Sequence, residues 1–265
     1  MNRKPARKPF AKKSFGQNFL VDAKYIQRIV DSLALTCDDT VVEIGAGRGA
    51  LTEMLLKKAG NVFAIELDRD LIPVLRERFG TLPNFELVAA DALSVDFSIF
   101  AGKERKPKLV ANLPYNISTA ILQRLIEYRF VFSEMILMFQ REVAHRISAR
   151  PGNSERGSLT VLVEAAFSVE KLFDVSPKAF IPEPKVVSAI VKLYPRASEV
   201  RNEEAFRKLV AACFAKKRKT IGNNLKTAFA DWRQVLDTAA IDANRRAETL
   251  TMDEWLRLHE AISTI

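Results

Sequence analysis

Hydrophobic and polar positions change in regular blocks between residues 39 and 112, and the blocks predict strands that alternate with helices. Apolar residues recur at helical spacing at Leu51, Met54 and Leu55, and a second helix is predicted from about Asp70 to Phe79. Short apolar runs predict buried strands over residues 40–44, 62–65, 85–88 and 109–111. Strand, helix, strand repeated in this way indicates right-handed βαβ units and a parallel sheet, so we expect an α/β fold.

The remaining pattern predicts two parts. Further elements are expected as a helix over 118–128, a strand over 135–139, a helix over 157–166 and a strand over 186–194. Ser118 or Thr119 is the expected N-cap of the first of these helices. After Pro195 the chain holds one glycine, no proline and strong helical periodicity. We therefore assign residues 14–195 to the α/β domain and 196–265 to a small all-helical domain.

The first 13 residues form a basic segment with six Lys or Arg and no acidic residue. We expect a mobile, solvated tail over 1–13, with a basic arm lying on phosphates as the alternative. A mitochondrial presequence fits less well because the segment is rich in Lys and poor in Ser.

Composition excludes several classes of protein. The chain has 265 residues and 48% hydrophobic residues, which suits a soluble globule and not a disordered or fibrous chain. The longest stretch without a charge has 15 residues, too few for a membrane helix, and no signal peptide is evident. Two distant Cys and two isolated His predict reduced thiols, a cytoplasmic location and no metal. The net charge of +9 favours a polyanionic partner, either nucleic acid or an anionic membrane face.

Glycines between the first strand and helix indicate close approach of a ligand to the backbone. Gly45, Gly47 and Ala50 satisfy the pattern G-x-G-x-x-G/A, and Glu66 follows Gly45 by 21 residues, where a carboxylate can accept from ribose hydroxyls. A turn without ligand is the alternative. The pattern favours an adenosine-containing ligand but does not separate a nicotinamide cofactor from S-adenosylmethionine.

Two carboxylates favour the second of these cofactors. Glu43 precedes the glycines at the predicted strand end, where it would repel a pyrophosphate and attract a sulfonium or ammonium group. Asp91, followed by Ala92, ends the third strand and can accept from the exocyclic amine of adenine; a turn or capping aspartate is the alternative.

Three further segments could carry chemistry. Asn112-Leu-Pro-Tyr115 ends the fourth strand, and Pro114 restricts Leu113 to an extended backbone conformation. The Asn112 side chain and the Leu113 carbonyl can then accept hydrogen bonds from an amine. The ring of Tyr115 can stack on a base. The rigid, Pro-rich segment 180–186 begins with Phe180, which is either exposed for stacking or part of the core. Residues 216–219 form a cationic run, either a solvated helix face or a ridge that contacts phosphates, with Lys226 two turns further on.

Together with Gln17-Asn-Phe-Leu20, these motifs occur in an order that resembles the ribosomal RNA adenine N6-dimethyltransferases, from about residue 14 to the end. The resemblance is strongest to the bacterial small-subunit branch, which is linked to kasugamycin sensitivity. Ala46 stands where the family often has Pro. The resemblance implies a Rossmann-like domain that uses S-adenosylmethionine, with S-adenosylhomocysteine as product, and a helical C-terminal domain that recognises RNA. It further implies dimethylation of two adjacent adenosines near the 3′ end of 16S rRNA. We also expect a monomer without membrane contact.

The matched positions imply roles for single residues. Asn18 and Leu20 would close over the methionine end of the cofactor, Gly45 and Gly47 would let the backbone approach it, and Glu66 would bind its ribose. Asp91 and Ala92 would hold its adenine, and Asn112 would lie between the cofactor and the target amine. We further expect Tyr115 and Phe180 to sandwich the target adenine, with Phe180 partly exposed until the base arrives.

Three other functions remain open at this point. A methyltransferase of the same family that acts on large-subunit rRNA and confers macrolide resistance would carry nearly the same motifs. A nucleic-acid-binding protein without catalytic activity could share the fold, although the intact segment from Asn112 to Tyr115 argues against it. A nicotinamide-dependent dehydrogenase would need an acid or base for hydride transfer, and the motifs offer none.

Overall fold

The computed structural model describes residues 17–102, 104–197 and 199–264, which divide into two compact units. The sheet unit runs to Arg141 and includes Glu170–Tyr194, and the helical unit consists of Glu142–Val169 and the chain from Pro195 onward. The predicted division after residue 195 groups residues 142–169 with the sheet, whereas the compact units group them with the helices. The basic tail expected over 1–13 lies outside the described residues.

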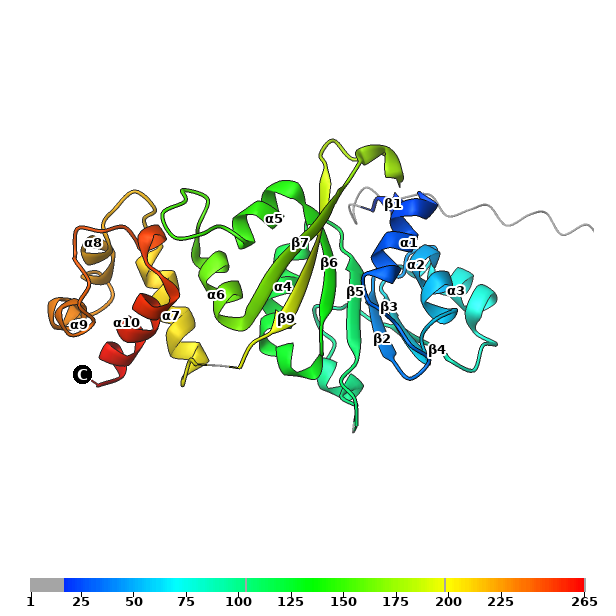
Figure 1. The fold of residues 1–265 in the computed structure, drawn as a ribbon, viewed down its shortest axis with the longest axis horizontal. Helices are drawn as coiled ribbons and strands as arrows, with labels where there is room; N and C mark the ends of the chain where they lie inside the picture. Colours follow the sequence, from blue (N-terminus) through cyan, green and yellow to red (C-terminus); the bar gives the residue numbers. More distant parts are fainter. Residues whose placement is uncertain (1–16, 103, 198, 265) are drawn as a thin grey trace, which may run out of the picture. The chain divides into compact units, whose positions relative to one another are not determined.

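Seven strands of the described residues form one sheet, in the order β4-β3-β2-β5-β6-β9-β7 (Figure 1). Their bounds are β2 Thr40–Ile44, β3 Asn61–Glu66, β4 Phe85–Ala89, β5 Lys108–Asn112, β6 Met135–Gln140, β7 Phe167–Val175 and β9 Ser188–Pro195. Neighbouring strands from β4 to β6 are parallel, as the sequence pattern predicts, and β9 is antiparallel to β6. The α/β class is therefore confirmed.

The order of the strands creates a switch point between β2 and β5. From β2 the chain continues outward to β3 and β4, and it then returns to β5 on the other side and continues to β6. Ile44 at the end of β2 lies beside Ala111 in β5. In open α/β sheets, ligands bind at the carboxyl ends of the strands at such a point, so the residues after Ile44 and Ala111 are placed to form a site.

Among the described residues, four α-helices accompany the parallel strands of the sheet unit. They are α1 Ala23–Asp31, α2 Ala50–Leu56, α3 Ile72–Phe79 and α4 Ser118–Glu127. Buried side chains of α1 and α2, such as Ile29 and Leu55, belong to one hydrophobic cluster with Val41, Val62 and Val110 of the sheet. These two helices therefore cover the sheet behind the switch point.

The predicted cap of α4 is wrong. The N-cap residue is Ile117, which makes no side-chain capping bond, and Ser118 lies inside the first turn. The Ser118 hydroxyl donates instead to the Tyr115 carbonyl at 3.0 Å. The hydroxyl thus stabilises the turn that leads from β5 into α4.

Two lysines hold the C-terminal end of α1. Lys108 Nζ donates to the Leu33 carbonyl at 2.7 Å, and Lys192 Nζ donates to the Ser32 carbonyl at 2.9 Å. Glu134 Oε2 lies 2.7 Å from Lys192 Nζ. Cations stabilise the free carbonyls at a helix C-terminus, so these contacts fix one end of α1 to the sheet.

The other end of α1 follows a short strand. β1 Phe19–Leu20 pairs antiparallel with β8 Phe180–Ile181, so that Leu20 lies opposite Phe180 and Phe19 opposite Ile181. We call this pair the β1–β8 ribbon. Val21 N extends it by donating to the Ala179 carbonyl at 2.9 Å. Phe19 and Leu20 therefore belong to a two-stranded sheet that directly precedes α1.

The helical unit contains the helices expected after Pro195 and one earlier pair. The α-helices are α5 Arg141–Ile147, α6 Ser158–Ala166, α7 Glu203–Cys213, α8 Ile221–Leu225, α9 Trp232–Thr238 and α10 Met252–Thr264. Short 3-10 helices complete the described elements. The sheet unit contains η2 Phe97–Phe100, η3 Arg129–Val131 and η4 Pro177–Ala179, and the helical unit contains η5 Ala247–Thr249. Trp255, Leu258 and Phe206 are buried at the centre of this unit.

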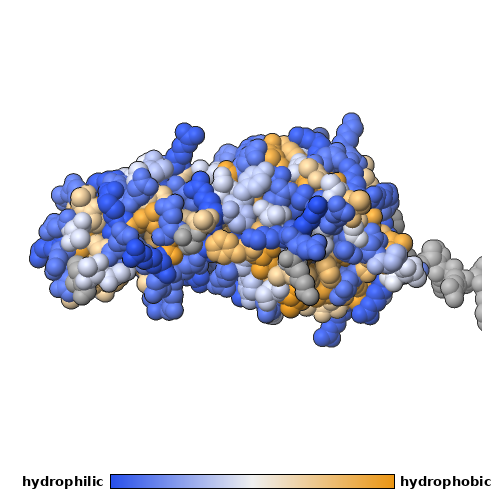
Figure 2. All heavy atoms as spheres, turned by 60° about the horizontal axis from the view of Figure 1, so that its bottom comes forward, coloured by the Kyte–Doolittle hydropathy of each residue, from blue (hydrophilic) through white to orange (hydrophobic). Residues whose placement is uncertain are grey.

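Hydrophilic side chains cover much of the face shown in Figure 2, with hydrophobic side chains visible between them. Among the described residues, no helix combines the length and the hydropathy needed to cross a bilayer.

Candidate active site

Three adjoining cavities lined by described residues open where β2, β3 and β5 end, and Gly45 lines all of them. We name them the central cavity, about 70 Å³, the β3–β4 cavity, about 130 Å³, and the α1–α2 cavity, about 440 Å³. They lie at the switch point of the sheet, where a ligand is expected on topological grounds.

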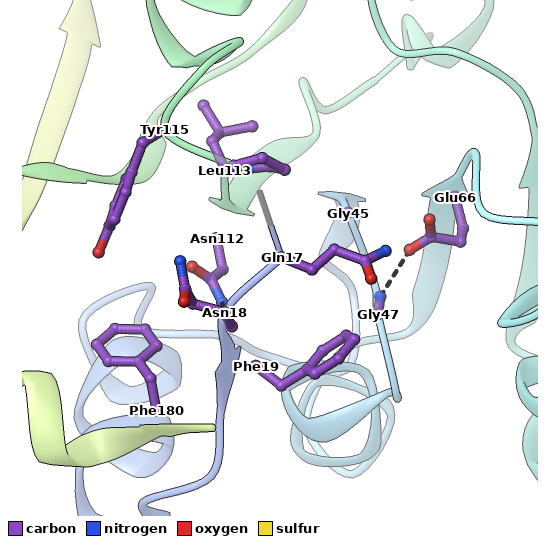
Figure 3. Close-up of a pocket in the computed structure, with 11 residues that line it drawn as sticks. Gln17, Asn18, Phe19, Gly45, Gly47, Glu66, Asn112, Leu113, Tyr115 and Phe180 are labelled. Carbon is purple, nitrogen blue, oxygen red and sulfur yellow. Dashed lines mark hydrogen bonds between the residues drawn. The ribbon is translucent and has the colours of Figure 1, made fainter. Parts of the chain in front are cut away.

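The structure brings the sequence-predicted site residues together around these cavities. The central cavity is lined by Asn18, Gly45, Gly47, Glu66, Asn112, Leu113, Tyr115 and Phe180. The β3–β4 cavity is lined by Gly45, Glu66, Asp91 and Ala92, and the α1–α2 cavity by Leu20, Gly45, Gly47 and Asn112. Figure 3 shows Tyr115 and Phe180 on one side of the central cavity, Glu66 on the other, and Asn18 and Asn112 between them.

The glycine loop after β2 has backbone conformations that strongly favour glycine. Gly45 has φ of 75° and Gly47 has φ of 59°, both in the left-handed region. A Cβ atom on Gly47 would also lie 3.3 Å from the Phe19 ring, closer than most side chains approach. The loop therefore leaves its backbone open to a ligand at Gly47, which lines both the central cavity and the α1–α2 cavity.

Glu66 organises this loop. One carboxylate oxygen accepts from Gly47 N at 2.8 Å, and the other accepts from Leu67 N at 2.9 Å and Asp68 N at 2.8 Å. Three of the roughly four acceptor positions of the carboxylate are thus used by backbone donors. Glu66 lines both the central and the β3–β4 cavity, so the remaining position can accept from a ligand hydroxyl.

Glu43 does not present its charge in the way that the sequence suggests. Its side chain is 1% exposed, and Thr52 Oγ1 donates to its Oε2 at 2.6 Å. Burial raises the pKa of Glu43 to about 7, and the nearby charge of Glu66 also raises it, whereas the bond from Thr52 lowers it. Because Glu43 is partly protonated near neutral pH, it attracts a cation less strongly than a full carboxylate charge would.

This raised pKa predicts a pH-dependent stability. Between the ordinary glutamate pKa of 4.5 and about 7, the folded chain keeps a proton on Glu43 that the unfolded chain releases. The free energy of unfolding should therefore fall as pH rises through this window. Above about pH 7, Glu43 should cause no further decrease. Glu43→Gln keeps an acceptor for Thr52 and removes the titration. We measure the thermal midpoints of this variant and of wild type across this pH range. The midpoint of the variant should rise relative to that of wild type as pH increases.

The exposed Glu86 in β4 offers a matched control, because Glu86→Gln removes one carboxylate without removing a buried proton site. Its midpoint should follow that of wild type at every pH. Parallel curves for Glu43→Gln and wild type would show that Glu43 titrates normally.

The Asn112 amide joins two parts of the site. Its Nδ2 donates to the Asn18 carbonyl at 3.5 Å, which links the end of β5 to the segment before β1. With the NH₂ group directed to Asn18, Oδ1 can accept from a ligand in the central cavity. Gln17, whose role sequence reasoning did not identify, makes a second link by donating to Asp68 Oδ2 at 2.9 Å. The motif 17–20 marks this segment but does not indicate its partners.

The expected partial exposure of Phe180 is wrong. Its side chain is 3% exposed and belongs to the hydrophobic cluster that contains Leu20, Val175 and Ala179. Pairing of β8 with β1 brings Phe180 opposite Leu20, so the ring is held in the core by the ribbon. Phe180 still lines the central cavity with Asn112 and Tyr115, and a stacking role therefore stays a prediction.

The cationic run lies in a loop and not on a helix. α7 ends at Cys213 and α8 begins at Ile221, and residues 216–219 between them are all exposed. Asn224, which is 2% exposed, holds this loop: its Nδ2 donates to the carbonyls of Cys213 at 2.6 Å and Lys216 at 3.2 Å. Lys226 is not on a continuous helix with the run.

The thiols and imidazoles lie elsewhere. Cys37 is exposed, Cys213 is buried in α7, and His259 is buried beside Phe206 in the helical unit. Across residues 17–102, 104–197 and 199–264, no cluster of three or more His, Cys, Asp or Glu is arranged to hold a metal ion.

Comparison with known proteins assigns the chain to a family. The model of the family described as ribosomal RNA adenine dimethylase matches residues 10–264. A "Ribosomal RNA small subunit methyltransferase A" from Clostridium botulinum is 43% identical over 260 residues, covering 96% of this chain and 94% of that protein.

Two solved structures share the fold. A dimethyladenosine transferase from Plasmodium falciparum has a TM-score of 0.78 and 29% identity, over 91% of this chain and 95% of the other. The 23S rRNA methyltransferase ErmE has a TM-score of 0.69 and 30% identity, over 93% and 100%.

Proposed function

The chain belongs to the ribosomal RNA adenine dimethylase family, and from this premise we propose that it dimethylates the N6 amine of two adjacent adenosines near the 3′ end of 16S rRNA. The substrate would be the small ribosomal subunit or its precursor, and S-adenosylmethionine would be the methyl donor. The observation that carries this proposal is the position of Asn112-Leu-Pro-Tyr115, which ends β5 at the central cavity beside Gly45. Acceptors for an amine and a ring for a base thus adjoin the glycine loop.

The residues present fit S-adenosylmethionine. Gly45 and Gly47, whose positive φ values favour glycine, expose a backbone without side chains, and Glu66 and Asp91 line the β3–β4 cavity as acceptors for ribose and adenine. Asn18 and Leu20 would contact the methionine end across the central and α1–α2 cavities. Bound there, the cofactor would supply an electrophilic methyl group on a sulfonium.

The chemistry requires orientation more than a strong base. The lone pair of the adenine N6 is delocalised into the ring, so this amine is a poor nucleophile. Asn112 Oδ1 and the Leu113 carbonyl, accepting from its two hydrogens, would favour a pyramidal nitrogen directed at the methyl group. The nitrogen loses its proton readily once alkylated, so catalysis would come from positioning and electrostatics.

The relatives favour the small subunit over the large one. The Clostridium protein, named for the small subunit, matches at 43% identity, whereas the structure of a 23S rRNA methyltransferase matches at 30%. Motifs around the cavities do not separate these substrates. Substrate choice is expected to reside in the helical unit, which presents the cationic loop.

Incubation with labelled S-adenosylmethionine and purified small or large ribosomal particles that lack these methyl groups tests the proposal. We expect label on two adjacent adenosines near the 3′ end of 16S rRNA. Label on large-subunit rRNA would support the macrolide-resistance activity instead. Binding to either particle without methyl transfer would indicate a non-catalytic RNA-binding protein.

Neutralising the cationic loop should weaken RNA binding in a salt-dependent way. If residues 216–219 contact phosphates, replacing all four by Gln should make the negative slope of log K against log salt shallower. The expected change is about 0.7–0.9 for each phosphate that is no longer neutralised. Cofactor affinity should not change, because the cavities lie in the sheet unit. Lys208→Gln is a matched control, since this α7 lysine is 73% exposed in its side chain and pairs with Glu204. An unaltered slope in the fourfold variant would mean that the run is only solvated.

A further inference from the structure

The Tyr115 hydroxyl has a buried partner that the motifs do not include. Tyr115 Oη lies 2.7 Å from Ser188 Oγ, and either atom can be the donor. Ser188 is 0% exposed and begins β9, opposite Gln140 of β6 in the antiparallel pair. The serine is therefore fixed by the sheet, 73 positions away from the tyrosine whose hydroxyl it contacts.

A fixed partner at the tip of the ring restricts how the ring can turn. The second side-chain torsion of tyrosine has a broad energy minimum, so packing at Cβ alone sets the ring plane only loosely. A hydrogen bond at the para position anchors the far end of the ring. Tyr115 is half-buried and lines the central cavity with Asn112, so the anchored ring presents a defined surface there.

We propose that Ser188 is a positioning residue for methyl transfer, which presets the Tyr115 ring to stack the target adenine. The proposal rests on the function proposed above, because the orientation of the ring matters only when a base enters the central cavity. Burial raises the pKa of the Tyr115 phenol, so the hydroxyl stays protonated and able to bond throughout the pH range of the reaction.

Because Ser188 is buried in a strand, a purely structural role must be separated from positioning. If Ser188 acts through the phenol hydroxyl, removing the serine hydroxyl or removing the tyrosine hydroxyl breaks the same hydrogen bond. Ser188→Ala and Tyr115→Phe should then have the same effect on methyl transfer, and the double variant should be no worse than either. A serine needed only for strand packing would give losses that multiply.

The experiment measures kcat and KM for RNA in wild type, both single variants and the double variant. We expect each single variant and the double variant to lose about 2- to 12-fold in kcat/KM, the range for one neutral hydrogen bond. Cofactor affinity should stay close to wild type, and the thermal midpoint should fall slightly in all three variants, because each loses the same buried hydrogen bond. RNA with 2-aminopurine at the target position should show less fluorescence quenching by all three variants, since quenching reports stacking.

Two matched variants complete the design. Ser118 is also buried, but its hydroxyl donates to the Tyr115 carbonyl and not to the ring, so Ser118→Ala and Tyr115→Phe should combine multiplicatively. Ser188→Thr retains the hydroxyl and should restore most of the rate. Wild-type rates in Ser188→Ala, or losses that multiply with Tyr115→Phe, would overturn the proposal. Absence of methyl transfer by wild type in the same assay would instead refute the proposed function.

Discussion

Phe180→Leu is expected to lower kcat/KM for methyl transfer by roughly 5- to 150-fold and to leave cofactor affinity unchanged. Stacking of a base on an aromatic side chain contributes about 1–3 kcal/mol, which corresponds to that range of rates. Leucine keeps the apolar contacts to Leu20 and Val175 in the core but has no ring face. The measurement is steady-state methylation of small-subunit particles, with cofactor binding followed by calorimetry.

The burial of Phe180 makes a stability control necessary. Its 3% exposure means that leucine also leaves a small cavity, which lowers the free energy of unfolding. Phe139 in β6 is 0% exposed and does not line the three cavities, so Phe139→Leu creates a similar defect away from the site. Both variants should lose thermal stability, and only Phe180→Leu should lose methyl transfer. Wild-type rates in Phe180→Leu would exclude the sandwich with Tyr115.

Glu66→Ala is expected to weaken S-adenosylmethionine binding by about 12- to 150-fold, while RNA affinity stays nearly intact. A hydrogen bond to a charged group contributes about 1.5–3 kcal/mol, and the alanine variant loses the one to the ribose. It also leaves Gly47 N without its acceptor, so the glycine loop should become less ordered. Calorimetric titration with the cofactor gives the affinity directly.

Two controls separate these effects. Glu66→Gln keeps one acceptor oxygen and should bind the cofactor with intermediate affinity. Glu86→Ala removes an exposed carboxylate from the neighbouring strand β4 and should behave as wild type. If Glu66→Ala bound the cofactor as tightly as wild type, the assignment of the β3–β4 cavity to adenosine would fail.

The parallel part of the fold could be predicted because its signal is periodic and local. Each of the first four strands is a short apolar run, and a helical spacing or a turn signal follows it in the sequence. The ends of those strands, at Gly45, Glu66, Asp91 and Asn112, share one edge of the sheet by the rule of parallel strands. Residues far apart in sequence can therefore be placed together from the pattern alone.

The features that could not be predicted depend on partners far away in the sequence. β1 and β8 have two residues each, too few for any periodicity, and their pairing buries Phe180. The Ser188 contact to Tyr115 requires the register of β9 against β6, which the pattern does not contain. Residues 216–219 follow a helical stretch without a glycine or proline to mark its end, so the pattern does not distinguish the loop that Asn224 holds from a continued helix.

The β1–β8 ribbon has a consequence for how the protein is made. Leu20 and Phe180 are 160 positions apart, and contacts that close such long loops are slow to form. During translation, the segment around Asn18 is synthesised early but has no strand to pair with until Phe180 and Ile181 have left the ribosome. The nascent chain can form the glycine loop and β3 well before then. We expect the methionine end of the site to mature last, so a chain that stops before residue 179 would contain most of the cofactor motifs and still lack a finished binding site.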